Sequence, residues 1–96
     1  MKVDLDAKIL DLRGKPISDS GTEMTLSHVI CGAMLNTLPT DQDMKVTDKV
    51  RMFGLAERAV KGGEQEFSLE DLSFIKERVG RLFGPLVVGR TFSILC

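Results

Sequence analysis

The sequence predicts an α+β fold, a single small domain over residues 1–96 in which an N-terminal strand or β-hairpin packs against three to four α-helices. Alternating apolar and charged residues near the start of the chain predict the strand, because that period leaves one face half-buried. Farther along, apolar residues recur every three or four positions between Thr, Ser, Gly or Pro, which is typical of capped amphipathic helices. A chain of 96 residues is long enough for one core and too short for two.

The strand or hairpin is expected over residues 2–18. The alternating apolar residues within it are Val3, Leu5, Ala7 and Ile9. The stretch RGKP then places glycine and proline in turn-forming positions, and Ile17 resumes a short return strand.

Two helices are expected in the middle of the chain, over residues 25–38 and 47–61. Thr25 provides an N-cap hydroxyl for the first helix, and Pro39 ends it because proline cannot continue a helix. The second helix ends at the pair Gly62–Gly63. Its apolar positions are Val50, Phe53, Ala56 and Val60.

Two further helices are expected over residues 68–83 and 85–95. Ser68 followed by Asp71 resembles a capping box, with aspartate in place of the preferred Glu or Gln. Pro85 suits the first turn of the last helix, where its missing N–H costs nothing. One face of the helix at 68–83 is lined by Leu72, Ile75, Val79 and Leu82.

Two stretches of similar sequence precede helices, Glu23–Val29 (EMTLSHV) and Glu66–Leu72 (EFSLEDL). Each reads as a short extended segment leading into a capped helix. We expect the two extended segments to lie beside each other as a small β-bridge.

Composition indicates a globular protein of the cytoplasm. The chain is 43% hydrophobic and 28% charged, far from a disordered composition. Its two cysteines, Cys31 and Cys96, do not make a disulfide framework, and Cys31 is expected as a buried thiol. The first residues lack the apolar run of a signal peptide, and the uncharged stretch from Met24 to Thr40 is too polar to span a bilayer.

The stretch GPLVVGRT, Gly84–Thr91, differs by one residue from the phosphate-binding pattern GxxxxGK[ST]. A phosphate loop follows a buried strand and opens a long helix, whereas this stretch follows an amphipathic helix and precedes five residues. Arg90 replaces the lysine, and Pro85 removes a backbone donor. We therefore expect a helix–helix corner and no nucleotide.

Other reactive residues are sparse. His28 and Cys31 lie three apart on one helix but lack the further ligands of a zinc site and the orienting partner of a nucleophile. Asp41 and Asp43 resemble the start of a calcium loop, but Lys45 occupies the next ligand position. We therefore expect no catalytic residue, no metal, no cofactor and no enzymatic activity.

The C-terminal helix is apolar on nearly every side, and a domain this small has limited core to cover it. It is either an internal helix or a contact with another protein, including a second copy of the chain. Basic residues of the second half could also gather on one face. The candidate interaction residues are Leu86, Val87, Arg90, Phe92, Leu95, Arg58 and Arg81.

A nucleic-acid-binding regulator is the alternative function. Against it, the chain has 13 basic and 14 acidic residues, whereas phosphate binding favours a basic surplus. Glutamates and aspartates also intersperse with the basic residues of the second half, as on an ordinary soluble surface.

The succession of DLRGKPI (Asp11–Ile17), TLSHVI, SLEDLSFIKERVG (Ser68–Gly80) and PLVVG (Pro85–Gly89) resembles small proteins encoded by tailed bacteriophages and prophages. That resemblance implies a phage origin and the host cell cytoplasm, and it carries over no active-site residue. The expected function is a non-catalytic protein-interaction module, either an assembly chaperone or an inhibitor of a host protein. Its expected binding surface is the C-terminal helix or the face of the second helix.

Overall fold

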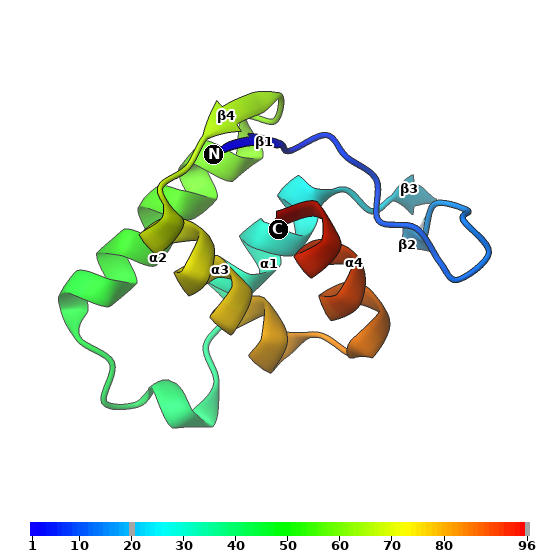
Figure 1. The fold of residues 1–96 in the computed structure, drawn as a ribbon. Helices are drawn as coiled ribbons and strands as arrows, with labels where there is room; N and C mark the ends of the chain where they lie inside the picture. Colours follow the sequence, from blue (N-terminus) through cyan, green and yellow to red (C-terminus); the bar gives the residue numbers. More distant parts are fainter. Residues whose placement is uncertain (20, 96) are drawn as a thin grey trace.

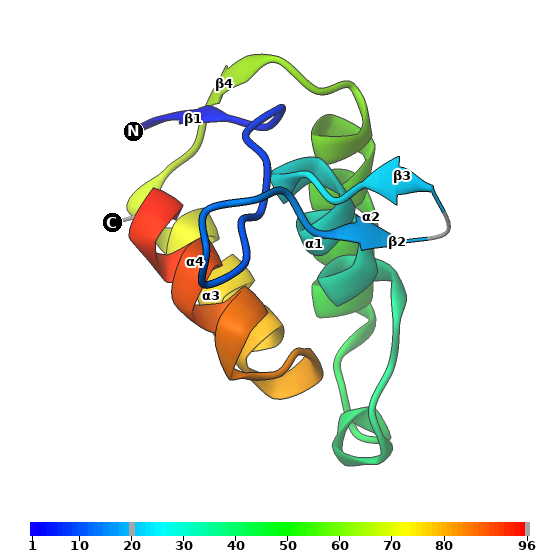
Figure 2. The ribbon, with the colours of Figure 1, turned by 90° about the vertical axis from the view of Figure 1, so that its right-hand side faces the viewer.

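A computed structural model describes residues 1–19 and 21–95, and it confirms the α+β class. Two helical pairs form the body of the protein, α1 with α2 and α3 with α4; β1 and β4 cross one end, and β2 and β3 project from the side (Figures 1 and 2). The elements of the described ranges are β1 (Lys2–Asp4), β2 (Ser18–Asp19), β3 (Thr22–Glu23), α1 (Leu26–Leu35), the 3₁₀ turn η1 (Pro39–Asp41), α2 (Val46–Val60), β4 (Glu64–Glu66), α3 (Leu69–Leu82) and α4 (Pro85–Leu95).

The return predicted near Ile17 is confirmed by an antiparallel bridge between Leu10 and Pro16, but the first strand does not pair within this hairpin. β1 pairs antiparallel with β4, far along the chain, with Val3 opposite Gln65 (Figure 1). β2 and β3 form a separate two-stranded pair, in which Glu23 faces Ser18. The expected bridge between the segments that precede α1 and α3 is therefore wrong, because each of these segments pairs with a different strand.

Local capping sets the start of α1, and a tertiary contact accompanies its end. The Thr25 hydroxyl accepts a hydrogen bond from the His28 N–H, and His28 Nδ1 accepts one from the Thr25 N–H, which confirms the predicted cap. The helix ends at Leu35, earlier than the expected residue 38. Asn36 adopts an extended backbone, and its Nδ2 donates to the Gly32 carbonyl at 2.6 Å.

The chain segment that follows α1 is locked by a buried ion pair. The Arg78 guanidinium of α3 donates to both carboxylate oxygens of Asp41, at 2.8 and 2.9 Å, and both side chains are at most 4% exposed. Arg78 also donates to the carbonyls of Asn36 at 2.8 Å and Ala33 at 3.4 Å. Asp41 accepts a further hydrogen bond from the Leu38 N–H, and that bond, together with Arg78, lowers the pKa of the carboxyl.

The turn after α2 requires glycine. Gly62 and Gly63 have φ values of +68° and +72°, in the left-handed region that other residues rarely adopt. A Cβ at Gly62 would also lie 2.7 Å from Oδ1 of Asp6. This tight turn brings β4 back against β1.

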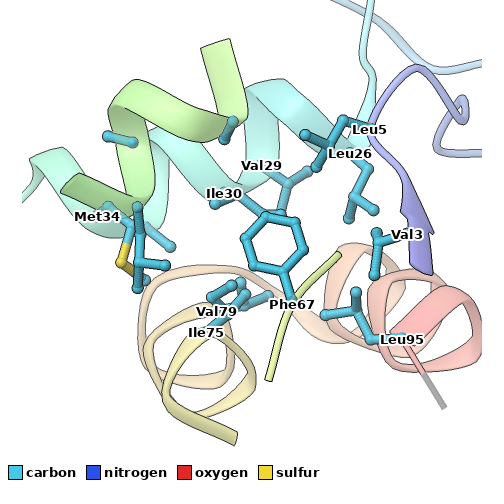
Figure 3. Packing of buried hydrophobic residues seen from close by; sticks show 14 of the residues in the cluster. Val3, Leu5, Leu26, Val29, Ile30, Met34, Phe67, Ile75, Val79 and Leu95 are labelled. Carbon is cyan, nitrogen blue, oxygen red and sulfur yellow. The ribbon is translucent and has the colours of Figure 1, made fainter. Parts of the chain in front are cut away.

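Phe67 lies at the centre of the core, between the two helical pairs (Figure 3). Its ring is 1% exposed, and it is surrounded by buried side chains from β1, α1, α3 and α4. Val3, Ile30, Ile75 and Leu95 are the clearest examples of these neighbours. Across the two described ranges, no helix has the combined length and apolar character needed to cross a membrane.

Candidate interaction surface

Helix α2 carries apolar side chains on two faces. The inner face packs against α1 and consists of Met52, Leu55, Ala56 and Ala59. Hydrogen bonds add to this contact, because Ser27 Oγ and Cys31 Sγ of α1 donate to carbonyls of Ala59 and Ala56. Of the apolar positions predicted for this helix, Ala56 alone belongs to the inner face.

The outer face of α2 is formed by four apolar residues that point into solvent. Their exposed fractions are 74% for Val46, 64% for Val50, 58% for Phe53 and 71% for Val60. The spacings of four, three and seven residues place them in one stripe along the helix. Because α2 lies at the edge of the molecule, no other element covers this stripe within the described ranges (Figure 1).

A shallow hollow of about 180 Å³ extends the outer face toward α1. Leu35, at the end of α1, borders it and is 61% exposed. Its other lining residues are Met34, Thr37, Met44, Lys49, Met52 and Phe53. Methionines make such a wall adaptable, since their side chains are unbranched and polarizable.

The side of α2 next to α3 is held by charged contacts. Asp71 accepts a hydrogen bond from Arg51 Nη2 at 2.9 Å and lies 3.7 Å from Arg58 Nη1. Arg58 also donates to the Glu66 carbonyl and lies over the Phe67 ring, 4.3 Å from its centroid. The predicted interaction residue Arg58 therefore holds α2 against β4 and α3. These contacts keep the helix, and with it the outer face of α2, in a fixed position.

The C-terminal helix, which held most of the predicted interaction residues, is largely internal. Leu95 is 1% exposed and belongs to the core, and Leu86, Val87 and Phe92 are half-buried. Arg90 donates from Nε and Nη2 to the carbonyls of Leu10 and Asp11, at 3.0 and 2.7 Å. These contacts attach the N-terminal turn to α4.

The remaining predicted residue, Arg81, is exposed and forms an ion pair with Glu77 at 2.8 Å. Arg58, Arg81 and Arg90 thus lie in three separate settings and are not brought together. Arg78, which the sequence places on a charged helix, is instead buried against Asp41.

The residues weighed for metal binding or catalysis have structural contacts. His28 completes the N-cap of α1, and burial raises the pKa of the Cys31 thiol, although a hydrogen bond with Ser27 opposes this. Among residues 1–19 and 21–95, no three His, Cys, Asp or Glu side chains gather closely enough to hold a metal ion. Of the stretch Gly84–Thr91, Gly84 precedes α4 and the residues from Pro85 onward form its first turns, and Cys96 lies outside the described residues.

Comparisons with known proteins give no match: no family model, no curated protein and no solved structure matches the chain. The candidate surface therefore stands on the geometry of α2. Its sequence signal was the set Val50, Phe53 and Val60, which the spacing had already placed on one helix. The structure adds Val46 and Leu35, which the sequence had not marked as part of this surface.

Proposed function

We propose that the protein is a non-catalytic protein-interaction module whose binding surface is the outer face of α2. The observation that carries this proposal is the row of four apolar side chains, each at least 58% exposed, along one stripe of a 15-residue helix. Single exposed apolar residues are ordinary on soluble proteins, but a contiguous row with an adjoining hollow is typical of contact surfaces.

The stripe suits a helical or grooved protein partner. Apolar side chains at helical spacing are the anchors by which an amphipathic helix enters a hydrophobic groove or packs against another helix. Phe53 stands in the middle of the stripe beside the hollow, which is where a central aromatic anchor contributes most to binding.

Rigid support lowers the cost of binding. α2 is bonded to α1 through Ser27 and Cys31 and to α3 through Asp71. A surface that is already ordered loses little conformational entropy when a partner docks. The helix is therefore preorganised for recognition.

The biological setting we propose follows the resemblance to small proteins of tailed phages. In that setting the module acts in the host cell cytoplasm, as an assembly chaperone or as an inhibitor of a host protein. Both roles require one surface that binds another protein, and the outer face of α2 supplies it.

Affinity capture with the tagged full chain tests the proposal. The measured quantity is the amount of captured protein other than the chain itself. Phe53→Ser is expected to remove the bound partner, whereas Leu12→Ser is expected to retain it. Leu12 is a matched control, since it is 87% exposed and borders a different hollow, beside α4. Capture that is unchanged by both Phe53→Ser and Val50→Ser would refute the proposal.

A further inference from the structure

We propose that the outer face of α2 also binds a second copy of this chain, with the two α2 helices packed antiparallel around a two-fold axis beside Phe53. The inference rests on the proposed function, because it names one occupant of the same surface. The dimer would cover the apolar stripe until a tighter partner displaces the second copy.

The first support is that four exposed residues are placed symmetrically around Phe53, although Val50 has no exposed counterpart because Ala56 is buried. Val46 and Val60 lie seven residues before and after it, and Lys49 and Glu57 lie four residues before and after it. All five are exposed. A two-fold interface requires that residue i of one copy meets residue j of the other and that j meets i. An antiparallel pair centred on Phe53 meets this requirement, because Val46 of each copy then faces Val60 of the other.

The second support is charge complementarity. In the antiparallel pair, Lys49 of each copy comes level with Glu57 of the other, which gives two ion pairs beside the stripe. A parallel pair would instead place Lys49 against Lys49 and Glu57 against Glu57, an arrangement that like-charge repulsion disfavours. Neither side chain has an ion pair within its own chain among the described residues. Both charges are therefore available to a second copy.

The size of the surface predicts a weak dimer. A helix of 15 residues is about 22 Å long. Stable interfaces bury about 800 Å² from each partner, and one face of a helix of this length, about 10 Å wide, offers less than that. We therefore expect a dissociation constant on the order of micromolar, which allows a second copy to be replaced by another protein.

The first experiment is sedimentation equilibrium of the full chain, with charge reversals on α2. Lys49→Glu and Glu57→Lys are each expected to weaken self-association about tenfold, because each creates two like-charge contacts. The double variant exchanges the charges and is expected to restore the dimer to within about threefold of the parent. Lys15→Glu, an exposed reversal in the N-terminal turn, is the control that leaves association unchanged.

The second experiment reads the orientation by disulfide formation in a chain whose own cysteines are replaced by serine. A mixture of Val46→Cys and Val60→Cys chains is expected to form mixed disulfides faster than either chain forms them with itself. Faster linkage of Val46→Cys to itself would indicate parallel pairing and overturn the proposal.

The outcomes separate this inference from the proposed function. A parent chain that stays monomeric up to about millimolar concentration overturns self-association. A dimer that persists in the Phe53→Asp variant also overturns the proposal. The same holds if the double variant, with Lys49→Glu and Glu57→Lys together, fails to restore the dimer. None of these results affects the capture of other proteins, which tests the proposed function by itself.

Discussion

The buried contact between Arg78 and Asp41 gives the sharpest prediction about stability. Replacing Arg78 with methionine keeps most of the apolar volume of the side chain and removes its charge and its donors. Three acceptors then lose their partner: the Asp41 carboxylate, at 2.8 and 2.9 Å, and the carbonyls of Asn36 and Ala33. A carboxylate that is 4% exposed would remain without its counter-ion.

The expected loss is large for one substitution. Removing one partner of a buried ion pair lowers the free energy of unfolding by about 3–5 kcal/mol. For a domain of this size, 1 kcal/mol corresponds to about 4–8 °C, so the midpoint of thermal unfolding should fall by at least about 12 °C. Urea denaturation at neutral pH measures the free energy of unfolding, and a temperature scan measures the thermal midpoint, with circular dichroism as the signal in both.

Arg81→Met is the matched control on the same helix. Arg81 pairs with Glu77 at the surface, with side chains 49% and 59% exposed, and such a pair contributes about 0.3–0.5 kcal/mol. Adding Asp41→Asn to Arg78→Met should recover part of the loss, because the amide leaves no uncompensated charge. Equal effects of Arg78→Met and Arg81→Met, within about 1 kcal/mol, would refute the assigned role of the buried pair.

Four further outcomes are expected. The pKa of Asp41 is lowered in the folded protein, so the ionised carboxyl stabilises the fold above the ordinary aspartate pKa of about 4. This stability is lost as the pH falls through the lower pKa of the folded state. Asp41→Asn should therefore make the free energy of unfolding less dependent on pH in this acid range. Phe67→Ala should cost about 3–5 kcal/mol in urea denaturation, whereas Phe53→Ala at the surface should stay within about 0.5 kcal/mol, and similar losses would contradict the packing described. Thr91→Val should raise the free energy of unfolding by about 1 kcal/mol, since the Thr91 hydroxyl is buried with no hydrogen-bond partner among the described residues. A lower free energy of unfolding in calorimetry would show that the hydroxyl is paired. Gly62→Ala should lower thermal stability by more than about 1 kcal/mol through its positive φ, and an unchanged melting temperature would argue against this turn.

Local signals in the sequence predicted the helices well. Thr25 and Ser68 cap α1 and α3 as expected, because an N-cap depends on residues three positions apart. Pro85 begins α4 for a different local reason, since its missing N–H costs nothing in the first turn of a helix. The end of α1 was placed too late, since Asn36 and the tertiary contact from Arg78 both act there.

The candidate surface could be predicted in part. The spacing of Val50, Phe53 and Val60 marked an apolar face of α2, but a second apolar face, with Met52 and Leu55, runs along the same helix. Which of the two faces enters the core depends on which one packs more closely against the neighbouring helix. The small side chain of Ala59 permits close packing against α1, but the sequence does not show that α1 is the neighbour.

Residues far apart in sequence were beyond local reasoning. Arg78 belongs to a charged helix and was expected at the surface, yet the fold brings it to Asp41. Leu95, at the end of α4, was a candidate contact for another protein, and the fold instead places it in the core. In both cases the deciding partner is supplied by another element of the fold.

The pairing of β1 with β4 fixes an order of events during biosynthesis. β1 leaves the ribosome before β4 and the ring of Phe67, which are made only after α1 and α2. Val3 therefore emerges without the strand that will pair with β1, and closure of this loop must wait for the later segment. A nascent chain stalled before β4 exposes this apolar N-terminal segment to the folding factors of the cell.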